Sequence, residues 1–378
     1  MTERDLVAVL GGGNGGHAVA AELALAGFAV NFFELPQFEA GFATVLRTRE
    51  VTVDGGSGER TARLNLTTTD IRSAVDGAGT IFVVTPAFGH KAMAEACAPH
   101  VREGQTVVLL PGTGGSLEFA RIFRRWKNTR GVVLAESTTL PFGARLKAPG
   151  IVSVFVKALI LPLGVFPAKR VTGVVKDLKR FFPAILPARD VLEAAVNNAN
   201  PIVHPVAALF NAGRIEHSRG DFHLYAEGMT PAVARAFESL NAERTAICRA
   251  MGYRLYHWDN LDFQGTSLGE TEEECREHIL TTSMDSCFGA GSIQPGLKMR
   301  GPADLKDRYI AEDVPYGMVL LSTLGALVKV PTPTHDAVIR LTSVINRTDY
   351  WKTGRSMKQL GLAGMDKKRL KAFLREGR

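Results

Sequence analysis

A glycine-rich stretch near the start of the chain has the composition and spacing of a dinucleotide-binding loop. Within Gly11–Gly16 the glycines follow the spacing G-x-G-x-x-G, directly after an apolar run that favours a strand. In such a loop the first glycine permits a tight turn, the second lets the backbone approach a pyrophosphate, and the third lets the next helix pack closely on the strand. The N–H groups that begin this helix can then bind phosphate oxygens. The candidate cofactor-binding residues of the loop are Gly11, Gly13, Asn14, Gly15 and Gly16.

Glu34 favours a nucleotide site over the alternative, a glycine-rich turn without a ligand. It lies 18 residues after Gly16, at the end of a second predicted strand, Ala29–Glu34, where a carboxylate can accept hydrogen bonds from both ribose hydroxyls. The same carboxylate would repel a 2′-phosphate, and residues 35–46 contain no arginine or lysine to bind one. The sequence therefore favours NAD over NADP.

Two further loops follow predicted strands and are candidates for the nicotinamide end of the site. They are Thr85–His90, in which Thr85 and Pro86 are the candidate contacts, and Pro111–Ser116. Ligands of parallel sheets bind outside the carboxyl ends of the strands, so both loops are expected to border the cofactor. Ordinary loop and helix-capping chemistry explains their composition equally well.

His204 is the histidine whose surroundings point to chemistry. It lies between Pro201 and Pro205, and three asparagines precede it within residues 197–200. The proline on its C-terminal side restricts the backbone, and the segment lies near the predicted domain junction, where a reacting group would be needed. The eight other histidines are explained more simply as surface or core residues.

A charged segment, Arg308–Gly317, precedes an apolar stretch that predicts a helix over Met318–Val328. Pro315 suits the first turn of that helix. Asp313 would then lie just before the helix N-terminus, where a carboxylate is favoured. Taken alone, the segment is explained best as a helix start with capping acids.

The elements that must position these residues alternate between strands and helices in the first half of the chain. Apolar runs that predict buried strands are Leu6–Leu10, Ala29–Glu34, Thr80–Thr85, Thr106–Leu110 and Val132–Ala135. Two more runs, Glu50–Asp54 and Ala62–Thr67, flank glycines and predict an inserted hairpin. Strands that alternate with helix-length segments predict an α/β, Rossmann-like, doubly wound domain.

From about residue 190 onward, apolar residues recur at helical spacing, which predicts a second, mainly α-helical domain. We place the dinucleotide-binding domain at residues 1–185 and the helical domain, which would carry the catalytic residues, at residues 186–378. Thr334, after two prolines, is expected to be the N-cap of a helix that begins at His335.

The composition is that of a globular protein, with 46% hydrophobic and 22% charged residues. The net charge of +7 alone fits nucleic acid, a membrane surface or small anions, and the motifs favour small anions. No nucleic-acid partner and no membrane are expected, because neither a recognisable nucleic-acid motif nor a membrane-length apolar run occurs. The oligomeric state stays open, with a homodimer among the alternatives.

The cysteines indicate a reducing compartment. They form no C-x-x-C pair, so neither a metal site nor a disulfide scaffold is predicted, and we expect a cytoplasmic location. The four cysteines are Cys97, Cys248, Cys275 and Cys287.

Over nearly its whole length the chain resembles the opine dehydrogenase family, which includes the octopine and nopaline dehydrogenases. The resemblance rests on the glycine loop and on the segments Glu136–Arg145, Asn197–Pro205, Arg308–Pro315 and Val330–Pro333. It implies an NAD(P)H-dependent reductive condensation of an amino acid, or another amine, with a 2-oxo acid such as pyruvate or 2-oxoglutarate, and the reverse oxidation.

The resemblance also implies roles for individual residues. His204 would be the catalytic acid/base, Asp313 its partner, and Arg308 would bind a substrate carboxylate, with Asn200 and Arg145 as further substrate-binding candidates. These residue types suit the chemistry. Histidine transfers protons near neutral pH, an aspartate can fix its tautomer, and a guanidinium binds a carboxylate through two parallel hydrogen bonds.

Two alternatives remain open. Ketopantoate and hydroxyacid-type reductases share the two-domain plan but resemble enzymes that use a lysine on the first helix of the second domain, and no lysine occurs between Lys179 and Lys298. A non-catalytic NAD-binding sensor would keep the fold without the chemistry. The amine donor is open as well, because Ala144 stands where some arginine-using relatives carry a cysteine before the arginine that corresponds to Arg145.

Overall fold

The computed structural model describes residues 5–55, 58–158, 160–256 and 300–377. The chain forms two compact units, one that ends at Val191 and one that begins at Leu192, and Gly377 belongs again to the first. The first unit extends beyond residue 185 because the strand β12 (Ile185–Pro187) still pairs with its sheet. The first unit holds a largely parallel sheet and the second is mainly helical, as the sequence predicts.

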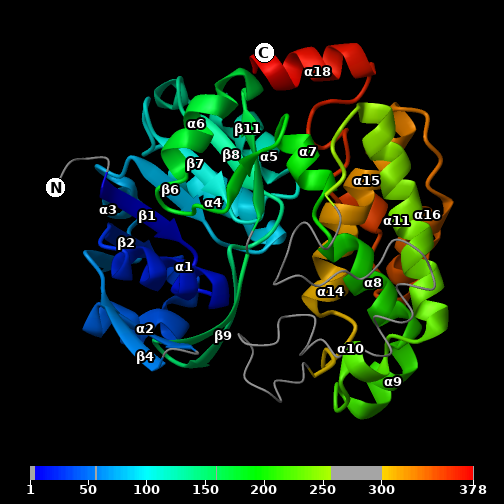
Figure 1. Cartoon of the computed structure of the whole chain (residues 1–378), viewed down its shortest axis with the longest axis horizontal. Helices are drawn as coiled ribbons and strands as arrows, with labels where there is room; N and C mark the ends of the chain where they lie inside the picture. Colours follow the sequence, from blue (N-terminus) through cyan, green and yellow to red (C-terminus); the bar gives the residue numbers. More distant parts are fainter. Residues whose placement is uncertain (1–4, 56–57, 159, 257–299, 378) are drawn as a thin grey trace. The chain divides into compact units, whose positions relative to one another are not determined.

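The main sheet of the first unit has eight strands in the order β12-β11-β8-β7-β6-β1-β2-β5 (Figure 1). The strands not yet introduced are β1 (Leu6–Leu10), β2 (Ala29–Phe33), β5 (Leu66–Thr68), β6 (Thr80–Val83), β7 (Thr106–Leu109), β8 (Val133–Ser137) and β11 (Leu161–Phe166). The six neighbouring strands β5, β2, β1, β6, β7 and β8 are parallel to one another, whereas β11 is antiparallel to β8. Their order is that of dinucleotide-binding domains, and it reverses between β1 and β6, where such sheets bind their ligands.

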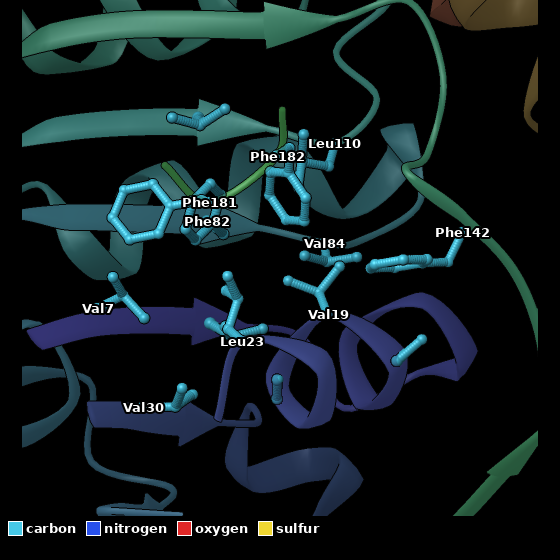
Figure 2. Packing of buried hydrophobic residues seen from close by; sticks show 14 of the residues in the cluster. Val7, Val19, Leu23, Val30, Phe82, Val84, Leu110, Phe142, Phe181 and Phe182 are labelled. Atoms are coloured by element: carbon cyan, nitrogen blue, oxygen red, sulfur yellow. The ribbon is translucent and has the colours of Figure 1, made fainter. Parts of the chain in front are cut away.

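The helix that follows β1 packs an alanine-rich face on this sheet. Ala18, Val19 and Leu23 of α1 (Asn14–Leu25) are almost completely buried. Figure 2 shows Leu23 near Phe82 of β6 and Val19 near Val84, within one apolar cluster that also contains Val7 of β1. Small alanines allow the helix to approach the strands closely, and each buried Val or Leu side chain contributes about 1.5–3 kcal/mol to folding. The remaining α-helices of the unit are α2 (Glu39–Thr48), α3 (Ile71–Val75), α4 (His90–Cys97), α5 (Gly115–Phe123) and α6 (Val171–Leu178).

A second sheet of the first unit has four strands in the order β4-β3-β10-β9. Its strands are β3 (Glu50–Gly55), β4 (Gly58–Arg63), β9 (Phe142–Ala148) and β10 (Ile151–Lys157). The predicted hairpin exists as β3 and β4, but the prediction that Ala62–Thr67 forms its second strand is wrong. Ala62 and Arg63 still belong to the hairpin, whereas Leu66 and Thr67 pair with β2 in the main sheet, so the predicted run is divided between two strands.

The second unit is built from helices. Within it, α11 packs against α8, α15 and α16, and α16 also packs against α8 and α15. In the described part of this unit the helical elements are α7 (Val191–Val196), α8 (Asn200–Phe210), α9 (Ala212–Ser218), α10 (Leu224–Glu227), α11 (Pro231–Met251), α14 (Arg308–Ala311), the π-helical turn η7 (Asp313–Met318), α15 (Val319–Leu327), α16 (Pro333–Ile345), α17 (Tyr350–Thr353) and α18 (Lys367–Glu376). α7 begins at the last residue of the first unit.

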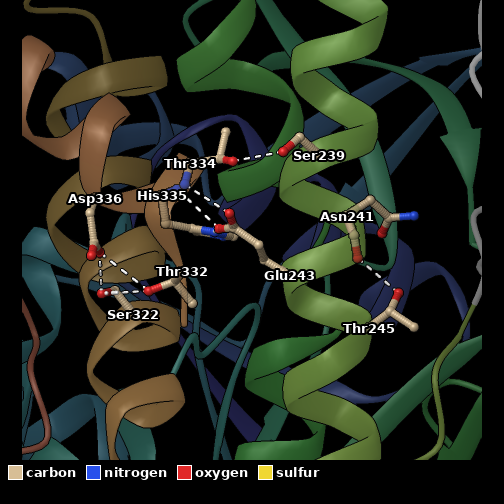
Figure 3. A network of polar contacts seen from close by, with 9 residues as sticks. All are labelled: Ser239, Asn241, Glu243, Thr245, Ser322, Thr332, Thr334, His335 and Asp336. Atoms are coloured by element: carbon tan, nitrogen blue, oxygen red, sulfur yellow. Dashed lines mark hydrogen bonds and ion pairs between the residues drawn. The ribbon is translucent and has the colours of Figure 1, made fainter. Parts of the chain in front are cut away.

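Glu243 of α11 caps the N-terminus of α16 (Figure 3). Its carboxylate accepts hydrogen bonds from the backbone N–H groups of Thr334 and His335, at 2.7 and 3.1 Å, and contacts His335 Nδ1 at 2.6 Å. Burial raises the pKa of Glu243, but these hydrogen bonds lower it by more, to about 2. The prediction of Thr334 as the N-cap is wrong, because the helix begins at Pro333 and the capping carboxylate comes from another helix.

Two sequence predictions concern membranes and cysteines. Among the described residues, no helix combines the length and apolar character needed to cross a membrane. Cys97 and Cys248 are buried and form no disulfide. Cys275 and Cys287 lie outside the described residues.

Candidate active site

Three glycines of the loop after β1 have the geometry that dinucleotide binding requires. Gly11 has a φ of +117°, and a Cβ there would lie 2.4 Å from the carbonyl oxygen of Val84. A Cβ on Gly16 would lie 1.7 Å from the carbonyl oxygen of Gly11, so α1 touches the loop directly. A Cβ on Gly13 would meet nothing within 4 Å, and Gly13 is exposed. The open backbone at Gly13 is where a pyrophosphate can approach.

The other two cofactor-binding candidates of the loop, Asn14 and Gly15, contact the rest of the first unit. Asn14 Oδ1 accepts a hydrogen bond of 2.8 Å from the backbone N–H of Leu146 in β9. A Cβ on Gly15 would lie 3.1 Å from side-chain atoms of Leu140 and Val84. Asn14 therefore ties the loop to β9, a structural role that the motif alone does not indicate.

Glu34 lies directly after β2 and holds two backbone N–H groups. Its Oε2 accepts from Gly12 at 2.8 Å, and its Oε1 accepts from Leu35 at 2.7 Å. Burial raises the pKa of Glu34, and the two hydrogen bonds partly offset this rise. Each carboxylate oxygen has a second lone pair, so Glu34 can bind the loop and still accept from a ribose hydroxyl.

Thr85 and Pro86 follow β6, next to the glycine loop. The Thr85 Cγ2 would lie 2.7 Å from a Cβ on Gly11. The Thr85 hydroxyl is buried and finds no hydrogen-bond partner within the part of the chain that the structure describes. A buried hydroxyl without a partner is costly, and a bound dinucleotide could supply one. These residues and the open backbone at Gly13 fit a nicotinamide dinucleotide.

A buried carboxylate shapes the loop that precedes α5, and sequence reasoning assigned it no role. Glu136 of β8 is fully buried and accepts hydrogen bonds from the N–H groups of Gly114, at 2.8 Å, and Ser116, at 2.9 Å. A Cβ on Gly112 would lie 2.2 Å from the Glu136 side chain. An acid inside the apolar run of β8 was the available signal, because such an acid needs buried donors.

In the second unit, His204 and Asp313 form a hydrogen-bonded pair. His204 Nδ1 lies 2.7 Å from Asp313 Oδ2, although the two residues are 109 positions apart. The side chains are 15% and 9% exposed, so the pair is largely shielded from water yet remains accessible. A short contact of this kind fixes the orientation of the imidazole ring.

Asp313 lies in a π-helical turn, not before a helix as predicted. The helical segment begins at Arg308, where the Asp307 carboxylate accepts from the N–H of Tyr309 at 3.1 Å. Pro315 lies within the turn η7 and not at the start of a helix. The N-cap thus comes from Asp307, and the predicted helix start at Pro315 is wrong because this proline lies inside a helical segment that is already under way. Single π-helical turns are frequent at functional sites.

The aromatic ring of Tyr309 covers one face of the His204 imidazole. The ring centroids lie 4.2 Å apart and the planes are inclined by 21°. Tyr309 is 8% exposed. Sequence reasoning included Tyr309 in a motif but gave it no role.

Arg308 lies on α14 beside the acidic residues of the same segment. Its Nε is 3.6 Å from Glu312 Oε2, and its side chain is 45% exposed. Partial burial lowers the pKa of Arg308, but the charges of Glu312 and Asp313 raise it by more, so the net shift is upward. Arg308 therefore stays cationic, and its side chain is partly exposed to solvent.

Asn200 and Arg145 occupy different places. Asn200 begins α8 and lies one turn before His204, so both are on the same face of that helix. Arg145 belongs to the first unit, where it is exposed on β9 and donates to the carbonyl oxygen of Ala144 at 3.2 Å. The second unit thus contains His204, Asp313, Arg308 and Asn200.

Two family models divide the chain between them. Residues 7–160 match ketopantoate reductase PanE/ApbA, and residues 187–346 match the NAD/NADP octopine/nopaline dehydrogenase, alpha-helical domain. The first match covers the glycine loop and Glu34. The second covers His204 and Asp313, and it separates this chain from reductases that share only the dinucleotide-binding domain.

Whole-chain similarity gives the same result. The chain is 35% identical over 367 residues to an opine dehydrogenase from Arthrobacter sp. (strain 1C), with 97% of each chain covered. Its fold is similar to that of an octopine dehydrogenase solved with NADH and agmatine, at a TM-score of 0.73 and 22% identity over 99% of this chain and 98% of the other. It is also similar to a yersinopine dehydrogenase solved with NADP+, at a TM-score of 0.69 and 16% identity over 98% and 97% of the two chains. The chain therefore belongs to the opine dehydrogenase family of NAD(P)-dependent oxidoreductases that act on CH–NH bonds.

Proposed function

We propose that this enzyme joins the amine of an amino acid to a 2-oxo acid such as pyruvate or 2-oxoglutarate, with NADH as reductant, and catalyses the reverse oxidation. The observation that carries the proposal is the 2.7 Å contact between His204 Nδ1 and Asp313 Oδ2. This contact supports the proposal because it lies in the helical unit, which matches the helical domain of this family. The amine donor and the choice of oxo acid are left to experiment.

The His204–Asp313 pair provides the proton transfers of the condensation. A carboxylate only accepts hydrogen bonds, so the proton of the pair lies on Nδ1, and Nε2 can exchange protons with the substrate. In the condensing direction, Nε2 of His204 takes a proton from the substrate ammonium group, and the free amine adds to the oxo carbon. Nε2 then gives this proton to the hydroxyl group of the carbinolamine, which leaves as water when the iminium forms. Asp313 stabilises the imidazolium between these two steps.

Arg308 binds a substrate carboxylate in this proposal. Its guanidinium is cationic, half exposed and located on the element that leads into the turn of Asp313. Two parallel hydrogen bonds to a carboxylate would fix both the position and the orientation of the substrate. Asn200, on the same helix face as His204, and Arg145, on β9, are the further candidates for substrate contacts.

NAD would be held by the glycine loop, by Glu34 at the ribose and by Thr85 and Pro86 after β6. When bound, it supplies or accepts the hydride at the carbon that becomes the new CH–NH centre. The open backbone of Gly13 and the buried hydroxyl of Thr85 support this placement. The carboxylate of Glu34 supports NAD over NADP, because it would repel a 2′-phosphate. We also propose a cytoplasmic location, supported by the free thiols of Cys97 and Cys248.

The test is an NADH-oxidation screen that crosses several 2-oxo acids with the common amino acids and polyamines. We expect NADH consumption that requires both an oxo acid and an amine, and that disappears in His204→Ala. If the protein binds NADH but does not oxidise it with any pair of oxo acid and amine, it is a sensor. Oxidation with an oxo acid alone would indicate a hydroxyacid-type reductase. Either result overturns the proposal.

A further inference from the structure

The π-helical turn that carries Asp313 touches α8 at a contact with no room for a side chain. A Cβ on Gly317 would lie 2.1 Å from Pro201 Cγ, 2.5 Å from Pro201 Cβ and 3.5 Å from Pro201 Cδ. The three nearest atoms thus all belong to Pro201, and both residues are buried. Carbon atoms in contact normally lie about 3.5–4.0 Å apart. Gly317 therefore sets how closely the turn and α8 approach.

A second contact holds the same turn from another side. The backbone N–H of Arg355 donates to the carbonyl oxygen of Pro315 at 2.7 Å. A Cβ on Gly354 would lie 2.6 Å from that same oxygen. The segment after α17 therefore holds η7 from one side, at a place where the hydrogen bonding within η7 is irregular. Pro201 of α8 contacts η7 from another side.

The contact and the acid/base pair join the same two elements. Pro201 precedes His204 by three residues on α8, and Asp313 precedes Gly317 by four residues in η7. In each element the two residues are about one turn apart, so they lie on the same side. A change of spacing at Gly317 and Pro201 is thus passed directly to the pair.

We infer that Gly317 and Pro201 are positioning residues that set the distance between His204 and Asp313. A methyl group at Gly317 would have to push η7 and α8 apart by on the order of 1 Å to restore normal contact distances. The 2.7 Å hydrogen bond would then exceed the range in which such bonds are strong. Misplacement by about 1 Å can lower a catalytic rate about 100-fold. The kinetic part of this inference rests on the proposed function.

The inference is tested with two variants and a control. The variants are Gly317→Ala and the double variant Gly317→Ala with Pro201→Gly, which removes the three atoms that the new methyl would meet. The control is Gly213→Ala in α9, where a Cβ would meet nothing within 4 Å. The first readout is kcat and the KM for NADH. The second is the downfield proton resonance of His204 Nδ1–H, assigned by its loss in His204→Ala, which needs no turnover.

We expect Gly317→Ala to lower kcat by about 10- to 100-fold, to leave the KM for NADH unchanged, and to shift or broaden the His204 proton resonance. The double variant should recover kcat to within about threefold of the wild type, together with the resonance, and Gly213→Ala should match the wild type. A folded Gly317→Ala protein with wild-type kcat and resonance overturns the inference. So does a double variant that remains as impaired as the single variant.

Two further outcomes are separated by the design. If Gly317→Ala does not fold, the double variant decides, because it must fold and show the wild-type resonance for the inference to stand. If the wild type turns over no substrate pair, the proposed function has failed, and the His204 resonance across the same variants still tests the positioning role.

Discussion

The ring of Tyr309 lies nearly parallel to the imidazole of His204, with centroids 4.2 Å apart. Asp313 holds one edge of the imidazole and Tyr309 covers one face, so two independent contacts fix the ring. Tyr309 and Asp313 lie on consecutive turns of one helical segment. One stretch of chain therefore supplies both constraints on the proposed base.

Replacing the aromatic ring should therefore cost activity. We expect Tyr309→Leu to lower kcat by on the order of tenfold, because a side chain without a flat face no longer restricts ring rotation. Tyr309→Phe keeps the stacked ring and should retain most of kcat. The comparison of kcat for the two variants, with NADH affinity measured by fluorescence, checks this. Equal kcat in both variants would show that the stacking of Tyr309 on His204 does not contribute to catalysis.

The hydrogen bond of the pair can be tested separately. Asp313→Asn keeps the shape of the side chain but lets it donate, which favours the wrong imidazole tautomer. We expect kcat to fall by about 10³- to 10⁴-fold, with unchanged NADH affinity. Asp307→Asn is the matched control, because it makes the same change in the carboxylate that caps this segment at its N-terminus. An Asp313→Asn enzyme with near wild-type turnover would remove Asp313 from the mechanism.

Cofactor choice should depend on Glu34. We expect Glu34→Gln to narrow the preference for NADH over NADPH by about tenfold or more, because it removes the charge that repels a 2′-phosphate. Glutamine can still accept from the N–H of Gly12, so the loop stays in place, whereas Glu34→Ala loses that hydrogen bond as well. The ratio of kcat/KM for the two cofactors is the measurement. An unchanged ratio in Glu34→Gln would show that the acid only supports the loop.

Two glycines of the loop should respond differently to alanine. Gly16→Ala places a methyl group 1.7 Å from the carbonyl oxygen of Gly11, and we expect a loss of stability of about 1–3 kcal/mol. Gly13→Ala meets nothing within 4 Å, so it should fold normally and weaken NADH binding instead. Thermal unfolding and NADH titration of both variants check this. Normal NADH affinity in Gly13→Ala would place the pyrophosphate elsewhere.

The Glu243–His335 contact predicts how stability depends on pH. The pKa of Glu243 is lowered from 4.5 to about 2 in the folded state. A carboxylate with a depressed pKa adds stability above its unfolded value, so this contribution is complete above about pH 4.5 and is lost as the pH falls toward 2. Glu243→Gln should lower the free energy of unfolding by on the order of 1 kcal/mol at pH 7. Unfolding curves from pH 7 to pH 3 should show this difference shrinking, and a constant difference would contradict the assignment.

Sequence alone predicted the parts of the structure that local rules govern. The tight turn at Gly11 and the close helix packing at Gly16 could be predicted, because each depends on a few neighbouring backbone atoms. The approach of a pyrophosphate to Gly13 stays a prediction. The alternation of strands and helices predicted the doubly wound sheet for the same reason. The division of residues 62–67 between β4 and β5 could not be predicted, because periodicity does not show where one strand ends and the next begins.

Contacts between segments far apart in the sequence could not be predicted from local patterns. The cap on α16 comes from Glu243, 91 residues before Thr334, so the local N-cap signal at Thr334 was misleading. The proximity of His204 and Asp313 followed only from the family resemblance, because nothing in their spacing indicates a contact. Their roles in catalysis, like those of Arg308 and Asn200, stay predictions until the variants are measured.

The π-helical turn η7 makes the acid/base geometry sensitive to chain length. A π turn closes its hydrogen bonds over one more residue than an α turn, so deleting a single residue there, such as Tyr316, would return the segment to a regular α-helix. Everything before the deletion would then rotate by about 100° around the helix axis relative to α15. Asp313 would leave the side that faces His204, although every residue of the pair would still be present. A relative that lacks one residue between Asp313 and α15 can thus keep the histidine and the aspartate and still lose the hydrogen bond between them.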